Sequence, residues 1–169
     1  GTVSAAGRLT AGSVAGSGSA VTATIAGLSS SAVVTVPSVP LFTAFVVNGG
    51  AVQRSKVTTA TLGFSLPVTL SPGAITLVRR GDGFTPAVSV SPASGPSSAY
   101  TLSFPGAGVV GGSLPDGVYD LTLTASAIRD AYTQPLSGGN QTRTLHRLFG
   151  DINGDATVPF YKELGNQGI

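Results

Sequence analysis

Polar and apolar residues alternate most regularly between positions 118 and 127 of the chain. Within this segment Tyr119, Leu121 and Leu123 stand at every second position, with polar residues between them. Successive side chains of a β-strand point to opposite faces, so this spacing places the large apolar residues on one face. A Pro-Asp-Gly turn signal precedes the segment, because proline fixes φ and glycine accepts positive φ. We therefore expect a half-buried strand here.

Comparable patterns predict six further strands in the central part of the chain. They cover residues 41–47, 57–65, 74–79, 87–91, 99–104 and 142–149. The segments between them are rich in Gly, Pro, Asn and Ser and predict turns, one of them at 67–73. Pro86 and Pro92 flank the fourth of these strands, which we place at a sheet edge because proline cannot donate to a hydrogen-bonded ladder. About seven strands at this spacing are typical of an all-β, immunoglobulin-like antiparallel β-sandwich, which we assign to residues 40–149.

Residues 1–36 form a separate segment with a single charged residue, Arg8. Alternation at 21–25 and again at 32–36, across a spacer at 27–31, predicts an extra N-terminal β-hairpin. Two or three strands cannot enclose a hydrophobic core alone, so the apolar face of this hairpin must dock on the main domain or on another molecule. The residues expected to make that subunit contact are Val21, Ala23, Ile25, Val34 and Val36.

Charged residues are rare in this chain and cysteine is absent. Charged residues make up 9% of the 169 residues, far below the roughly 25% usual in soluble globular chains. The chain has no cysteine, so its stability needs a hydrophobic core or another staple such as a metal or an assembly. It does not begin with methionine, and we expect it to be part of a longer precursor. No apolar run approaches the about 18 residues of a membrane-spanning helix, so no transmembrane segment is expected.

The charge distribution bears on the choice of partner. Nine Lys and Arg residues against seven Asp and Glu residues leave a formal net charge of +2. The basic residues are scattered, with only Arg79 and Arg80 adjacent, and aromatic residues do not alternate with them. Nucleic-acid binding is therefore not expected. A charge-poor surface rich in Ser and Thr is typical of an exported structural protein and predicts an extracellular or cell-surface location.

Residues that commonly carry catalysis are sparse. His146 is the only histidine, and no nucleophile motif accompanies it. Asp116 and Asp120 are expected to be a turn cap and a solvent-facing strand residue rather than a catalytic carboxylate pair. We therefore expect no enzymatic activity. Three tyrosines have two interpretations, a stacking platform for carbohydrate or packing at the corners of the sandwich: Tyr100, Tyr119 and Tyr132.

Three segments between residues 40 and 149 resemble a known type of module. They read V-T-T-A-T-L-G-F-S-L-P-V at 57–68, D-G-V-Y-D-L-T-L at 116–123, and I-R-D-A followed by P-L between Ile128 and Leu136. They are similar to the bacterial Ig-like modules of large cell-surface and S-layer-type proteins, in particular those of planctomycetes. Asp130 matches the aspartate of that pattern, whereas Tyr132-Thr133 replaces its usual Gly-Asn. The resemblance implies a surface module with an immunoglobulin-like fold.

The N-terminal segment resembles part of a second such module. Residues 8–36 are similar to its later half, through G-S-G-S-A-V-T-A-T-I-A-G-L-S at 16–29 and A-V-V-T-V-P at 32–37. The early strands of that module are then missing from this chain. An incomplete sandwich invites completion by a strand from elsewhere, as in donor-strand complementation.

The segment F-G-D-I-N-G-D-A-T-V at 149–158 resembles the first half of a dockerin-type or EF-hand-like calcium loop. The resemblance implies Ca²⁺ ligands at Asp151, Asn153, Asp155 and, through its carbonyl, Thr157. Calcium prefers hard oxygen ligands, which these alternate positions supply. Ala156 stands where the family has glycine, which strains the turn. The alternative is an Asp-, Asn- and Gly-rich turn that closes the domain, within a loop-rich tail at 150–169.

These features lead to two functional hypotheses. The first is a structural subunit of an extracellular surface assembly, such as a filament, a sheath or an S-layer-like coat. Its copies, or neighbouring modules of a surface protein, would be joined by β-strand addition. The second is an adhesin or carbohydrate-binding module of a large secreted protein, with glycans as partners.

Overall fold

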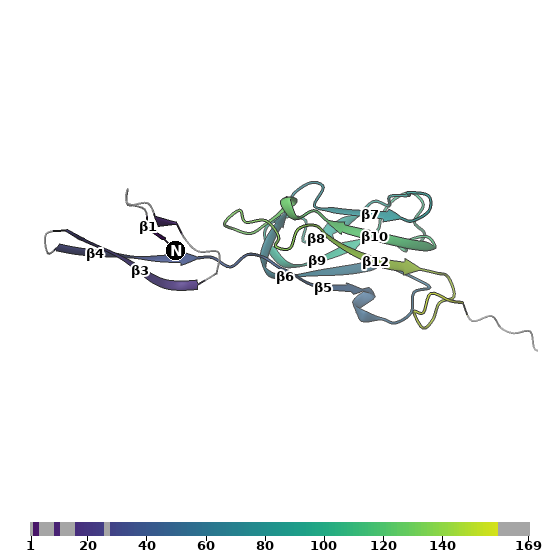
Figure 1. The fold of residues 1–169 in the computed structure, drawn as a ribbon. Helices are drawn as coiled ribbons and strands as arrows, with labels where there is room; N and C mark the ends of the chain where they lie inside the picture. The colour runs from purple at the N-terminus through teal and green to yellow at the C-terminus, as the bar shows by residue number, and fades with distance from the viewer. Residues whose placement is uncertain (1, 4–8, 11–15, 26–27, 159–169) are drawn as a thin grey trace, which may run out of the picture. The chain divides into compact units, whose positions relative to one another are not determined.

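The computed structural model describes residues 2–3, 9–10, 16–25 and 28–158 of the chain (Figure 1). The chain divides into two compact units, Gly1–Val39 and Pro40–Ile169. The strands of the first unit are β1 (Thr2–Val3), β2 (Leu9–Thr10), β3 (Gly16–Ile25) and β4 (Leu28–Val36). β1 pairs with β2, and β3 pairs with β4, in both cases antiparallel.

The β3–β4 pair is the hairpin that the sequence predicts, with a shorter connection. Its register places Ile25 opposite Leu28 and Val21 opposite Ala32. The predicted spacer at 27–31 is therefore wrong, because the serines of this stretch belong to β4 and pair with β3. Strand pairing uses backbone N–H and C=O groups, which serine provides as well as valine does.

Over residues 40–158, the described part of the second unit, the chain forms eight strands and two short 3₁₀ turns (Figure 1). The strands are β5 (Phe42–Val47), β6 (Thr59–Leu70), β7 (Ile75–Arg79), β8 (Ser89–Ser91), β9 (Ser97–Ser103), β10 (Gly117–Leu123), β11 (Ile128–Arg129) and β12 (Gln141–Arg147). The turns are η1 (Asn48–Gly50) and η2 (Ala125–Ala127).

These strands form two antiparallel sheets. One has the order β12-β10-β7, and the other the order β11-β6-β9-β8, with β5 also paired to β6. The path β5-β6-β9-β8 opposite β7-β10-β12 matches the ABED and CFG sheets of the immunoglobulin sandwich. The predicted fold class is therefore confirmed.

A single hydrophobic core fills the space between the two sheets. As predicted, the alternate residues Tyr119, Leu121 and Leu123 of β10 point inward and are buried. The largest fully buried apolar side chains are Val57, Leu62, Val68, Leu102, Phe104, Leu114, Tyr119, Leu121, Leu123 and Ile128. All of the described core residues lie between Val47 and Leu145, so the second unit has a core of its own.

β6 differs from the prediction because it continues through Pro67 to Leu70, where a turn was expected. The ladder with β9 shifts register between Gly63 and Val68, so the proline lies in an irregular stretch where its missing N–H costs little. Beyond this point β6 changes neighbour from β5 to β11, a strand that the sequence did not predict.

The predicted strand at 118–127 is shorter than expected and ends at Leu123. The 3₁₀ turn at Ala125–Ala127 follows it and redirects the chain into β11. The Thr124 N–H still donates to the Ala74 carbonyl over 2.9 Å, so the ladder with the β7 side persists for one further residue.

Two tyrosines fasten loops to the ends of strands. Tyr119 is fully buried, and its hydroxyl donates to the Pro115 carbonyl over 2.9 Å, which is the tyrosine corner of immunoglobulin-like sandwiches. The hydroxyl of Tyr100 lies 2.5 Å from the Val68 carbonyl and 3.0 Å from that of Gly95. Burying each ring with a hydrogen-bonded hydroxyl fixes the position of the adjoining loop.

We expect Tyr119→Phe to lower the free energy of unfolding by about 1 kcal/mol, because it removes a hydrogen bond to a carbonyl at the edge of the core. Urea denaturation followed by circular dichroism measures this change. Tyr132→Phe is the matched control, since Tyr132 is 70% exposed. Equal stability of the Tyr119→Phe variant and the native chain would contradict the role of the corner.

Candidate functional site

The loop that follows β12 is organised around the carboxylate of Asp151, whose side chain is 0% exposed. One carboxylate oxygen, Oδ1, accepts a hydrogen bond from the Gly154 N–H over 2.6 Å. The other, Oδ2, accepts from the Ala156 N–H over 3.1 Å and lies 2.9 Å from His146 Nε2. The side chain therefore closes its own loop and ties that loop to β12.

The backbone of Asp151 makes a second connection. Its carbonyl accepts hydrogen bonds from the N–H groups of Arg54 and Ser55, each over 2.9 Å. The Arg147 guanidinium donates to the Ser55 carbonyl over 2.9 Å. The loop after the last strand is thereby joined to the segment between β5 and β6, at one end of the sandwich.

The other predicted calcium ligands contact one another. Asn153 Nδ2 donates to Asp155 Oδ2 over 2.8 Å, and Thr157 donates to Asp155 Oδ1 from its N–H over 2.8 Å and its hydroxyl over 2.6 Å. Asp151 instead directs both carboxylate oxygens to protein donors. Among residues 2–3, 9–10, 16–25 and 28–158, no group of three or more His, Cys, Asp or Glu residues is placed to hold a metal ion. A bound calcium ion would have to replace several of these hydrogen bonds.

The turn geometry explains two residues of this loop. Ala156 has φ of 65°, in the left-handed region where glycine is unstrained, as its place in the loop predicts. Gly154 has φ of 76°, and a Cβ atom there would lie 2.3 Å from the Val52 carbonyl oxygen. The loop therefore packs against the 52–55 segment so closely that only glycine fits at position 154.

The hydrogen bonds of this loop affect the acidity of its carboxyl groups. Burial raises the pKa of Asp151, but hydrogen bonds from His146 and from the N–H groups of Gly154 and Ala156 outweigh it and leave that pKa below its usual value. The pKa of Asp155 is also lowered, chiefly by the Thr157 hydroxyl and the Asn153 amide. Both carboxylates are thus held in the charged form.

The contribution of Asp151 to stability should therefore depend on pH. A carboxyl group with a lowered pKa in the folded state stabilises the protein above its unfolded pKa of about 4, and loses this effect as the pH falls through the folded value. Asp151→Asn should lower the urea midpoint clearly at pH 7, and the gap to the native chain should close in acid. Asp155→Asn, at an exposed carboxylate of the same loop, should cost less. A difference in urea midpoint between Asp151→Asn and the native chain that does not change with pH would contradict stabilisation by the charged carboxylate.

Calcium binding stays a prediction, and melting temperatures in chelator and in calcium test it. Concentrations up to about 1 mM cover the affinities of extracellular calcium modules. A rise of several degrees that is lost in Asp155→Asn would support a site in this loop. Identical melting curves would contradict it.

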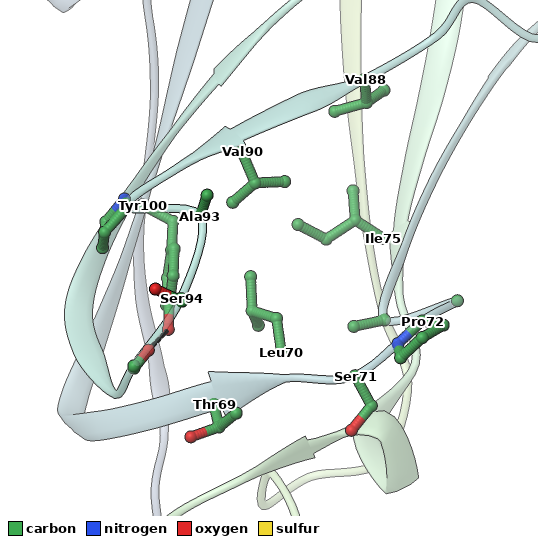
Figure 2. A pocket seen from close by; sticks show the side chains of 14 residues that line it. Thr69, Leu70, Ser71, Pro72, Ile75, Val88, Val90, Ala93, Ser94 and Tyr100 are labelled. Carbon is green, nitrogen blue, oxygen red and sulfur yellow. Dashed lines mark hydrogen bonds between the residues drawn. The ribbon is translucent and has the colours of Figure 1, made fainter.

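A pocket of about 310 Å³ opens at the other end of the sandwich, between the edge strands of the two sheets (Figure 2). Figure 2 shows Leu70 of β6, Ile75 of β7, Val90 of β8 and Val88, which precedes β8, converging on it. No lining residue is charged. The lining comprises residues Thr69, Leu70, Ser71, Pro72, Gly73, Ala74, Ile75, Val88, Val90, Pro92, Ala93, Ser94, Gly95 and Tyr100.

The residues predicted to make subunit contacts all belong to the first unit. Val21, Ala23 and Ile25 lie in β3, and Val34 and Val36 lie in β4. The register pairs β3 and β4 so that these residues occupy alternate ladder positions, with a shift near the open end of the hairpin. Their side chains lie outside the described part of the structure, and their role stays a prediction.

The carboxylates of Asp116 and Asp120 are occupied by arginines. Asp116 pairs with Arg147, and Asp120 makes two hydrogen bonds to Arg80, over 2.8 and 2.7 Å. The Arg80 guanidinium, helped by the Thr144 hydroxyl, lowers the pKa of Asp120. These are the contacts of solvated surface ion pairs, whose contribution to stability is small.

The turn that follows β7 holds a third ion pair, between Arg79 and Asp82. Arg79 binds Asp82 through Nε over 3.0 Å and through a terminal nitrogen over 2.5 Å. With the Phe84 N–H, this guanidinium lowers the pKa of Asp82 to about 2. The turn at residues 79–82 thus has a defined ion pair at its base.

Sequence reasoning missed two features of these sites. One is the pairing of His146 with Asp151, which depends on a loop folding back over β12. The Asp-x-x-Gly spacing at positions 151–154 indicated a turn but not the burial of its carboxylate. The other is the pocket, because apolar residues of edge strands give no sequence signal that distinguishes a pocket from core.

Comparison with protein-family models and with curated proteins finds no match. One solved structure that the chain resembles is the N-terminal part of the bacterial S-layer protein SbsC. The identity is 18% and the TM-score 0.39, over 64% of this chain and 24% of that one. A likeness this distant carries no argument about function. Within the described residues, no helix is long and apolar enough to cross a membrane.

Proposed function

We propose that the protein is a structural subunit of an extracellular surface assembly, in which copies of the chain or neighbouring modules are joined by β-strand addition. The observation that carries the proposal is the two-stranded sheet of β3 and β4, which lies in a compact unit of its own. This hairpin is the part of the chain that would be shared between subunits.

A two-stranded hairpin is marginally stable in water and gains stability by pairing with a further strand. Each strand of such a pair leaves one row of N–H and C=O groups outside the ladder, which is a template for another chain. Natural edge strands are commonly protected by charged residues, yet residues 9–53 contain none. The hairpin is therefore suited to an edge that becomes covered on assembly.

The second unit is suited to be a rigid building block. Its core is complete, and its cohesion does not depend on the first unit for any of the described core residues. The charge-poor, Ser- and Thr-rich composition supports an extracellular location. Low charge also reduces the repulsion between closely packed copies.

The alternative, a carbohydrate-binding or adhesive module, would use an exposed aromatic platform. Two of the three candidate tyrosines, Tyr100 and Tyr119, are buried and bound to carbonyl groups. Only Tyr132 is exposed, and a single ring does not form a platform. Glycan binding therefore has no specific support, and the assembly function is the stronger proposal.

Sedimentation velocity of the full chain against a chain lacking residues 1–36 tests the proposal. We expect the full chain to associate as its concentration rises, and the shortened chain to stay folded and monomeric. Circular dichroism and melting curves check that the shortened chain retains its sandwich. A full chain that remains a monomer at every concentration, with a shortened chain equally stable, would contradict assembly through the first unit.

A further inference from the structure

We propose that the free edge of β7, together with the pocket between β7 and β8, accepts strand β3 from a second copy of the chain. This inference rests on the proposed function and names the surface that receives the donated strand. The donor strand is uncharged and alternates Val21, Ala23 and Ile25 with threonines. The acceptor is built entirely from residues of the second unit.

The backbone of β7 has one side that its own sheet does not use. The Thr124 N–H donates to the Ala74 carbonyl over 2.9 Å, and the Arg80 N–H donates to the Val118 carbonyl over 2.8 Å. Hydrogen-bonded pairs alternate with non-hydrogen-bonded pairs along an antiparallel ladder, so every second residue between these points turns its backbone groups away from β10. The residues that do so are Ile75, Leu77 and Arg79.

Only one end of this edge is covered. The Arg79 N–H donates to the Phe84 carbonyl over 2.8 Å, and the Gly83 N–H donates to the Arg79 carbonyl over 3.1 Å. The chain then crosses to the other sheet, where β8 pairs with β9. Among the described residues, Ile75 and Leu77 have no backbone partner on the outer side. These two residues offer the hydrogen-bonding groups that one added strand needs.

The pocket beside this edge suits the side chains that β3 would bring. Leu70, Ile75, Val88 and Val90 surround it, and none of its lining residues is charged (Figure 2). In strand addition the backbone ladder supplies affinity, while pockets receive alternate side chains of the added strand. Valine, alanine and isoleucine at every second position would fill an uncharged apolar pocket and remove its surface from water.

Two other sheet edges, those of β8 and β12, are less open than β7. β8 has three residues and is followed closely by Pro92, which cannot extend a ladder. β12 lies beside β5, where the Arg143 guanidinium stands over the Phe42 ring, 4.9 Å from its centroid. The apolar pocket and the unused backbone groups coincide at β7.

The strand order gives a further reason to place the added strand beside β7. The sheet that contains β7 has three strands, whereas the opposite sheet has five. Val88 and Val90 face the pocket instead of a strand of the smaller sheet (Figure 2). Adding the β3–β4 hairpin beside β7 would extend the smaller sheet to five strands and place a strand opposite β8.

The experiment uses full-length chains and one pair of matched variants at the acceptor. Val90→Lys places a charge in the pocket, whereas Ser89→Lys places the same charge on the exposed face of the same strand. We expect Val90→Lys to weaken self-association in sedimentation velocity by about tenfold or more, because an unpaired charge would be buried. Ser89→Lys should associate as the native chain does.

A mixing experiment separates a blocked acceptor from a misfolded one. Ala23→Lys should block donation but leave the acceptor intact, and Val90→Lys should do the reverse. Each variant alone should be monomeric, and an equimolar mixture should form a dimer in which Val90→Lys donates to Ala23→Lys. Such rescue is not expected if either variant had merely lost its fold.

The outcomes distinguish this inference from the proposed function. If Ala23→Lys abolishes association but Val90→Lys does not, assembly through the hairpin stands and the β7 acceptor is wrong. If both variants are monomeric and their mixture stays monomeric, the pairing of these two surfaces is wrong. If the native chain itself never associates, the proposed function fails as well.

Discussion

The burial of one apolar layer between two sheets is the constraint on which the whole sandwich depends. Leu62 and Leu102 from one sheet and Tyr119 and Leu121 from the other belong to this layer, and all four are buried. With no cysteine in the chain, no disulfide bond reinforces this layer. Polar contacts such as those of Asp151 fix loops at the ends of the sandwich, beyond this apolar layer.

At both ends of the sandwich, an aspartate carboxylate accepts hydrogen bonds from backbone N–H groups of its own loop. At one end Asp151 holds its loop through backbone N–H groups. At the other end Asp130 Oδ1 accepts from the N–H groups of Tyr132 over 2.9 Å and Gln134 over 2.8 Å. In each loop a residue other than glycine has positive φ, 63° at Thr133 and 65° at Ala156. Both loops therefore have a shape that glycine would adopt without strain.

Much of the fold follows from local pattern, because alternation along a strand directly reports which face is buried. The inward face of β10 was predicted on that basis, and the edge position of β8 from its flanking prolines; both are confirmed. The continuation of β6 through Pro67 was not predicted, since a proline is tolerated there only because the ladder shifts register and changes partner. That is a tertiary circumstance with no local signal. The strand β11 is two residues long and exists only because β6 extends to meet it.

The candidate sites were less predictable than the fold. The spacing of Asp151, Asn153 and Asp155 marked a loop, but it did not show that the Asp151 side chain binds His146 or that the Asp151 carbonyl accepts from Arg54, which is distant in sequence. The free edge of β7 follows from the crossing of the chain to the other sheet after Phe84, which no residue pattern announces. Positions within elements were thus predictable, whereas contacts between elements were not.

The direction of the first and last strands of the sandwich has a mechanical consequence. β5 begins beside Pro40, and β12 ends at Arg147, which bonds to Ser55 beyond the far end of β5. The chain therefore enters the sandwich at one end and leaves it at the other. Tension applied through the two termini would run along β5 and β12 and load their ladders in shear, so that many hydrogen bonds must break together instead of one after another. A module threaded in this way transmits a pulling force along its length while its core stays closed.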